Sequence, residues 1–220
     1  MQITDTIWQV GGDSMTAPGD AAIYLIAFDD TAALIDAGCG QGHGKLIQNI
    51  SRYVPAETKI EYLFLTHCHF DHVGGAESIR RHFGCKIVAH ERDAEYLESG
   101  DSMVTAARWY NAYLEPLPVD YKMSAAEETF RIGNGEIRAF HCPGHSPGSL
   151  VCVTEVPGKK ILFGQDVHGP LHPELLSNRT DYMHSLKFLL SLEADILCEG
   201  HCGVYKGKKE VRDFISSFIR

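Results

Sequence analysis

The sequence predicts an α+β fold in which two sheets pack face to face and helices cover the outside. Two observations lead to this prediction. Short apolar runs of strand length alternate with turns rich in Gly, Pro and Asp, and the second half of the chain repeats the outline of the first, each half ending in helices. No linker or low-complexity segment divides the 220 residues, so we expect one domain over residues 1–220, made of two similar halves.

The elements of the first half are predicted from apolar runs and from the turns that bound them. Asp29 and Asp30 separate two such runs and are typical of a hairpin turn. Leu46, Ile47 and Ile50 recur at helical spacing. The expected strands are 7–10, 22–28, 32–35, 61–66 and 86–90, and the expected helices are 45–53, 76–83 and a segment that begins at Glu91.

Residues 99–127 interrupt this alternation, and we interpret them as a helical insertion. The run 103–113 is expected to be helical and to end before Pro116 and Pro118, because proline lacks a backbone N–H and disfavours helix before it. The alternation then resumes. The expected strands of the second half are 136–140, 149–155, 160–163 and 195–198, and the expected helices are 181–192 and 208–219.

Composition narrows the range of partners. The formal net charge of −9 argues against a nucleic-acid partner, because phosphate backbones are bound by basic surfaces. No apolar run approaches the length of a membrane span, and the first residues lack the basic and apolar regions of a signal peptide. The seven cysteines are odd in number and form no CxxC pair, which is typical of reduced thiols. We therefore expect a cytoplasmic protein that binds neither nucleic acid nor membrane.

Residues 66–75 contain the most closely spaced metal-binding side chains of the chain. They read Thr-His-Cys-His-Phe-Asp-His-Val-Gly-Gly, and four of them bind metals in many proteins: His67, His69, Asp71 and His72. The apolar run 62–65 precedes them and reads as a buried strand, and packing alone does not require such polar groups behind it. The pattern predicts a metal site on the loop after this strand, with Cys68 alternating to the opposite side and packed behind it.

Three further candidate ligands repeat this local pattern of an apolar strand, a loop and a metal-binding side chain. His145 lies in His-Cys-Pro-Gly-His-Ser-Pro-Gly, whose turns follow the strand 136–140. Asp166 and His201 each follow another expected strand. Any one of them alone could be an ordinary turn residue. The repetition indicates a site that they share with residues 66–75.

The pattern His67-x-His69-x-Asp71-His72, followed by His145, Asp166 and His201, resembles the metallo-β-lactamase superfamily. The similarity extends from the Asp36-x-Gly38 turn to His201 and implies a four-layer αββα sandwich with metals at one edge. By this resemblance, one divalent metal ion would be held by His67, His69 and His145. A second would be held by Asp71, His72 and His201, with Asp166 bridging the two. Zn2+ is expected, although the same ligands accept Fe or Mn.

The resemblance also implies the chemistry, that of a metal-dependent hydrolase. A hydroxide bridging the metals would attack a small ester, lactone or thioester, while Asp71 orients it and carries a proton. An alternative is a persulfide dioxygenase with one iron on His67, His145 and Asp166. Nucleases of the superfamily are disfavoured by the acidic charge, and its B1 β-lactamases have Cys where Asp166 stands. The chain ends soon after His201, without the helical domain of the longer glyoxalase II enzymes, which disfavours a glutathione thioester.

Some residues near the ligands are candidates for contact with a small-molecule substrate. His168 and His172 are each expected to donate a proton or to bind substrate, although a surface-loop role fits them equally. His141 and Glu199 are expected to orient ligand imidazoles. Pocket walls and ordinary packing remain equal alternatives for the other two candidates, Tyr110 and Tyr113. A homodimer is left open.

Overall fold

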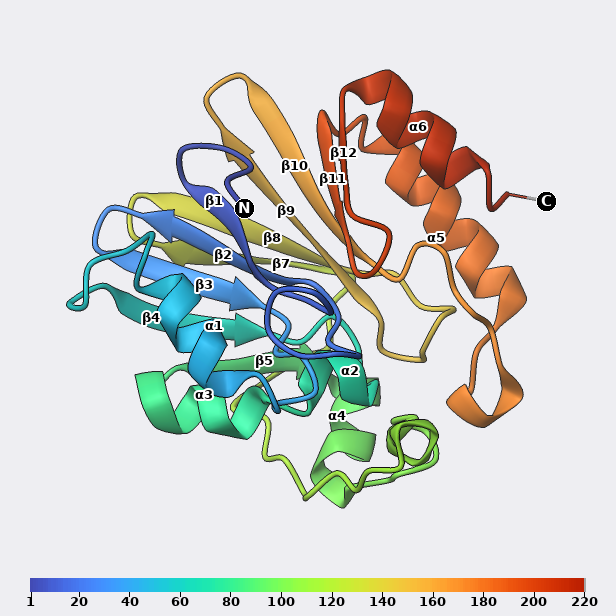
Figure 1. Ribbon diagram of the computed structural model, residues 1–220. Helices are drawn as coiled ribbons and strands as arrows, with labels where there is room; N and C mark the ends of the chain where they lie inside the picture. Colours follow the sequence, from blue (N-terminus) through green and yellow to red (C-terminus); the bar gives the residue numbers. More distant parts are fainter. Residues whose placement is uncertain (220) are drawn as a thin grey trace.

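The structure is a computed structural model that describes residues 1–219, and its centre is a pair of six-stranded sheets (Figure 1). The first sheet has the order β1-β2-β3-β4-β5-β6, with antiparallel pairing up to β3 and parallel pairing beyond it. Its strands are β1 (Ile7–Gly11), β2 (Ile23–Phe28), β3 (Thr31–Ile35), β4 (Lys59–Phe64), β5 (Lys86–His90) and β6 (Tyr121–Met123).

The second sheet has the order β12-β11-β10-β9-β8-β7, and β10 and β11 form its one parallel pair. Its strands are β7 (Glu127–Ile132), β8 (Gly135–His141), β9 (Leu150–Val156), β10 (Lys159–Gln165), β11 (Ile196–Glu199) and β12 (Val204–Lys206). The prediction of two sheets is therefore confirmed. The Asp29-Asp30 hairpin is confirmed as well, because Phe28 pairs with Thr31 across it.

Helices cover the outer faces of both sheets (Figure 1). The first sheet is covered by α1 (His43–Ile50), α3 (Ala76–Phe83) and α4 (Glu91–Ser99), and the second by α5 (Arg179–Ser191) and α6 (Lys208–Ser216). The remaining helices are the short α2 (Phe70–Val73) and two 3-10 turns, η1 (Ala107–Tyr110) and η2 (Pro173–Leu175). The four-layer αββα sandwich is confirmed.

Alternation along the strands distributes the apolar side chains among three core layers. Leu25 of β2 packs toward the helices of the first half, whereas Ile26 packs toward the second sheet. In β9, Cys152 faces the space between the sheets and Val153 faces α5 and α6. Because central strands are buried on both faces, they read as continuous apolar runs, which made them predictable from sequence.

The prediction of a helix over residues 103–113 is wrong. Only η1 is helical there, and it is a single 3-10 turn. Ala106 and Asn111 flank it with φ angles of 58° and 51°, in the left-handed region, so a right-handed helix ends on both sides. Asp101 Oδ1 accepts two backbone N–H bonds at the start of the segment and favours a turn. The insertion is consequently built of turns.

Five short elements were missed by the sequence prediction: α2, β6, β7, β12 and the 3-10 turn η2. In β7 only Phe130 and Ile132 are buried, so its apolar signal is weak. The elements β6 and β12 have three residues each, too few for a periodic pattern. None of these omissions moves the predicted ligands, because the ligands follow β4, β8, β10 and β11.

The topology gathers the loops that carry the chemistry. The loops after β3, β4 and β5 leave the carboxyl edge of parallel strands in the first sheet, and those after β8, β10 and β11 leave the corresponding edge of the second. Backbone hydrogen bonds join the two edges: Leu150 N–H donates to Thr66 O at 2.6 Å, and Ala22 N–H donates to Gly200 O at 2.7 Å. Residues distant in sequence therefore meet at one end of the sandwich.

Candidate metal centre

The seven predicted ligands converge in two groups. The first group consists of His67, His69 and His145, whose ring centroids lie 4.4 to 4.7 Å apart. One nitrogen of each ring lies within 4.8 Å of one nitrogen of each of the others, which is close enough for all three to reach a single ion. Two of these residues follow β4 and the third follows β8, so both sheets contribute to the group.

The second group consists of Asp71, His72 and His201. His201 Nε2 lies 3.3 Å from His72 Nε2 and 3.1 Å from Asp71 Oδ2. The short helix α2 places Asp71 and His72 side by side, and the loop after β11 brings His201 to them. These contacts bring two nitrogens and one oxygen together.

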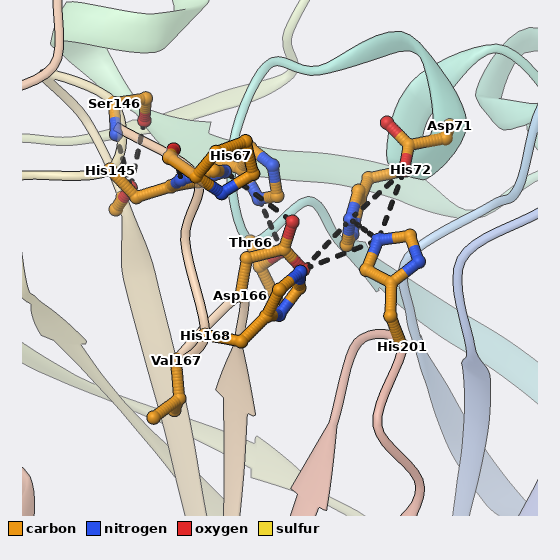
Figure 2. A network of polar contacts seen from close by, with 12 residues as sticks. Thr66, His67, Asp71, His72, His145, Ser146, Asp166, Val167, His168 and His201 are labelled. Carbon is orange, nitrogen blue, oxygen red and sulfur yellow. Dashed lines mark hydrogen bonds and ion pairs between the residues drawn. The ribbon is translucent and has the colours of Figure 1, made fainter. Parts of the chain in front are cut away.

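Asp166 lies between the two groups (Figure 2). Its Oδ2 is 3.4 Å from His145 Nε2 in the first group. Its Oδ1 is 3.2 Å from His72 Nε2 and 3.5 Å from His201 Nε2 in the second. The carboxylate thus presents one oxygen to each group.

The donor set fits divalent metal ions. The Nε2 atoms of His67, His69 and His145 are buried and make no hydrogen bond to the described residues. Buried polar atoms without partners are costly, so three of them facing one another indicate a ligand. Imidazole nitrogens and carboxylate oxygens suit zinc and other first-row metals, and no thiolate is among them.

The charges around the two groups differ. Burial, together with the neighbouring His72, lowers the pKa of His67 well below its usual value, and burial likewise lowers that of His69. These rings are therefore neutral and ready to bind a cation. Burial also lowers the pKa of His201, but Asp166 and Asp71 outweigh it and raise that pKa to about 9. Without metal, the second group therefore retains a proton near neutral pH.

Hydrogen bonds behind the ligands fix the orientation of their rings. Asp36 Oδ2 accepts from His72 Nδ1 at 2.8 Å. Pro170 O accepts from His145 Nδ1 at 2.9 Å, and Thr66 Oγ1 lies 3.1 Å from His67 Nδ1. Because Nδ1 is occupied in each ring, Nε2 is the atom that faces the centre. Asp36 had been identified only as a turn residue, and its φ of 63° does place it in a turn.

Asp93 connects the two loops that carry the first group. It is fully buried in the first turn of α4 and accepts three hydrogen bonds. The donors are Cys68 N–H at 2.9 Å, Ser146 Oγ–H at 2.6 Å and Gly148 N–H at 2.6 Å. Cys68 is buried behind the ligands, as predicted. Sequence reasoning missed Asp93, because nothing local distinguishes it from a solvated helix residue.

The expectation that His141 and Glu199 orient ligand imidazoles is not what the structure shows. His141 stacks on His90 with ring centroids 3.7 Å apart, and its Nε2 donates to Pro147 O. Glu199 instead accepts from the backbone N–H groups of His201 and Cys202, and from His168 Nδ1 at 2.8 Å. Glu199 therefore braces the His201 loop and aims the His168 ring.

A cavity of about 200 Å3 opens beside the ligands. His168 and Tyr110 line it, and burial and the Asp71 carboxylate raise the pKa of Tyr110 above its usual value. Tyr113 lines a different cavity of about 800 Å3, which none of the seven ligands borders. His172 lies outside the smaller cavity's lining and packs against Trp109. The structure therefore separates the four candidates that the sequence left together.

Comparisons with known proteins agree with this geometry. A family model described as the metallo-β-lactamase superfamily matches residues 16–201. The chain is 30% identical over 145 residues to hydroxyacylglutathione hydrolase GloC of Haemophilus influenzae, covering 64% of each protein. It is 26% identical over 196 residues to a human acyl-coenzyme A thioesterase, covering 78% of this chain and 68% of that protein. The matches to the first curated relatives span between 57% and 64% of those proteins.

Solved structures show the same fold. The subclass B3 metallo-β-lactamase BJP-1 of Bradyrhizobium japonicum superposes with a TM-score of 0.78 at 23% identity, covering 99% of this chain and 89% of that one. An archaeal superfamily protein from Sulfolobus tokodaii gives a TM-score of 0.73 at 22% identity, covering 98% and 86%. At such identities the likeness concerns the fold alone. No helix within residues 1–219 is long and apolar enough to cross a membrane.

Proposed function

The chain belongs to the metallo-β-lactamase superfamily, and we propose that it is a binuclear metal-dependent hydrolase that cleaves a small ester, lactone or thioester. The observation that carries the proposal is the position of Asp166, with one oxygen toward each of the two ligand groups. Such a shared carboxylate is suited to two ions at once. Among these three substrate classes we favour a thioester, because two relatives are a hydroxyacylglutathione hydrolase and an acyl-coenzyme A thioesterase.

His67, His69 and His145 would hold one ion, Asp71, His72 and His201 the other, and Asp166 both. Two zinc ions bound there would polarise a substrate carbonyl and lower the pKa of a bound water. With three protein ligands and one shared carboxylate for each ion, positions stay open for water and substrate, as in catalytic rather than structural sites.

The protein's own groups would handle the protons. Asp71 borders the cavity and lies 5% exposed, so it can accept a hydrogen bond from the attacking water and take its proton. Glu199 holds His168 Nδ1, which leaves Nε2 of the same ring for the substrate. Because His168 borders the cavity too, it is placed to donate a proton to the leaving group.

Metal content measured together with hydrolysis tests this function. Protein purified without chelator is expected to contain two zinc ions per chain and to hydrolyse thioesters or esters. Exhaustive chelation should abolish the activity, and added zinc should restore it. The variant Asp166→Ala should lose both ions while Asp195→Ala, far from the ligands, should keep them. Full activity after metal removal would refute the proposal, as would one iron per chain with oxygen uptake on a persulfide substrate.

A further inference from the structure

The cavity beside the ligands has walls from two separate segments. Ala106, Trp109 and Tyr110 form one wall and come from the insertion around η1. Pro170 and Leu175 form the other and come from the loop between β10 and α5. Apart from the metal-ligand candidates, His168 and the Tyr110 hydroxyl, this lining is apolar. A substrate group that enters it contacts apolar side chains from both segments.

The two segments meet through an aromatic contact. The rings of Trp109 and His172 lie edge to face with centroids 5.2 Å apart. His172 is held in place because its Nδ1 accepts from Glu174 N–H at 3.2 Å. Its loop is tied to the first ligand group, since Ser177 Oγ–H donates to His145 O at 2.7 Å. Trp109 therefore contacts a loop whose position is fixed by a hydrogen bond to the candidate metal ligand His145.

Trp109 stays 50% exposed although it borders the cavity and contacts His172. Core packing does not account for that exposure. A ring that is in contact with water on one side and with a cavity on the other is suited to cover a bound apolar group. The contact with His172 sets the distance between the Trp109 ring and the opposite wall, which Pro170 and Leu175 form.

We propose that Trp109, set by its contact with His172, closes a subsite for the acyl group of the substrate and limits it to short, uncharged acyl chains. This rests on the proposed hydrolase function. The cavity of about 200 Å3 is smaller than the roughly 300–1,000 Å3 of pockets that enclose drug-sized ligands. Only the leaving sulfur of a bulky, charged thiol would approach His168, and the rest of that thiol does not fit in the cavity and extends into solvent. The part that fits is the acyl chain.

Hydrolysis of a chain-length series tests the subsite. Acetyl, butanoyl, octanoyl and dodecanoyl thioesters of one small thiol are compared by kcat/KM on zinc-loaded protein. The wild type is expected to prefer the short chains. Trp109→Ala should lower the preference for butanoyl over octanoyl by about tenfold or more, since even one methylene in an apolar pocket discriminates by about that factor. His172→Ala should act in the same direction, because it removes the contact that positions Trp109.

Tyr113→Ala is the matched control. Tyr113 is an exposed aromatic residue of the same insertion, but it borders the other cavity. Its substitution should leave the chain-length profile unchanged. A profile that neither Trp109→Ala nor His172→Ala alters would overturn the subsite while leaving the hydrolase function intact.

Binding of products provides a readout without turnover. The chain has two tryptophans, and Trp8 is buried against Tyr53 with ring centroids 5.3 Å apart. In Trp8→Phe protein, emission therefore reports Trp109 alone. Butanoate should shift this emission at lower concentration than dodecanoate. If no thioester, ester or lactone is hydrolysed, the proposed function fails, but this titration still decides the subsite. Equal responses to both carboxylates, or none, would refute it.

Discussion

The most demanding prediction concerns Asp93, which joins the loops of the first ligand group. Hydrogen bonds to charged acceptors are worth about 1.5–3 kcal/mol each, so three of them amount to roughly 5–9 kcal/mol before the cost of burying the carboxylate. Removing the carboxylate leaves three neutral buried donors without an acceptor, and an unpaired buried donor costs about 1–3 kcal/mol. Asp93→Ala should therefore destabilise the protein by about 4 kcal/mol, which corresponds to a fall in Tm of about 10 °C for a domain of this size.

The same substitution should weaken one metal position more than the other. Loss of Asp93 frees the loops of His67, His69 and His145, whereas the second group keeps its own contacts. Outer partners of metal ligands commonly change affinity by about 10–100-fold, and we expect that loss for one ion per chain. Competition titration with a chromophoric chelator measures the two affinities, and thermal melts in chelator measure stability.

Asp195→Ala is a control for this prediction. Asp195 also accepts a backbone bond, from Lys160 N–H at 2.8 Å, but it lies near α5 and β12 and not beside the ligands. The Asp195→Ala variant should lose about 1 kcal/mol of unfolding free energy and keep both metal affinities. The reasoning about Asp93 is refuted if Asp93→Ala melts within about 1 kcal/mol of the wild type, or if both ions are weakened equally.

Three further predictions follow from the same contacts. The first concerns protein kept in chelator, where the pKa of His201 is about 9 against 6.5 for a free ring. The stability that its proton contributes is complete below pH 6.5 and is lost as pH rises through 9, so Tm should fall over that window. A flat Tm would contradict this. Gly148→Ala should destabilise the protein by about 2 kcal/mol or more, because the new Cβ would lie 2.6 Å from Asp93 N. Gly44→Ala is the control: Gly44 lies in α1 with open space around it, so this variant should be neutral or stabilising. Denaturant melts measure both. His168→Ala should lower turnover by about 100-fold with metal content unchanged, and unchanged turnover would remove His168 from the chemistry.

The candidate ligands could be predicted to lie together because their sequence signal is local. Each lies on the segment that follows a buried strand, so a short window of sequence contains both the apolar run and the metal-binding side chain. His67, His145 and Asp166 show this pattern plainly. The parts of the site that were missed depend on distant pairs: Asp36 meets His72 across 36 positions of the chain, and Asp93 meets Gly148 across 55. A single sequence does not contain that information.

The helix predicted for residues 103–113 of the insertion was wrong for a different reason. The run 103–113 has ordinary helix formers, but Asp101 competes for the first N–H groups and left-handed residues end the turn on both sides. Tertiary contacts decide there, among them the approach of Tyr110 to Phe70, whose ring centroids lie 5.8 Å apart. Propensity is a weak guide where packing of this kind selects the backbone.

Asp36 and Asp93 both lie behind the candidate ligands, and they act in different ways. Asp36 bonds directly to the His72 ring, so its negative charge acts on the ligand itself and favours a bound cation. Asp93 touches no ligand ring and bonds instead to the residues beside His67, His69 and His145. Its amide analogue keeps an acceptor and loses the charge, so Asp93→Asn should largely preserve the first group's geometry. Asp36→Asn should weaken the second ion even where the fold is unchanged.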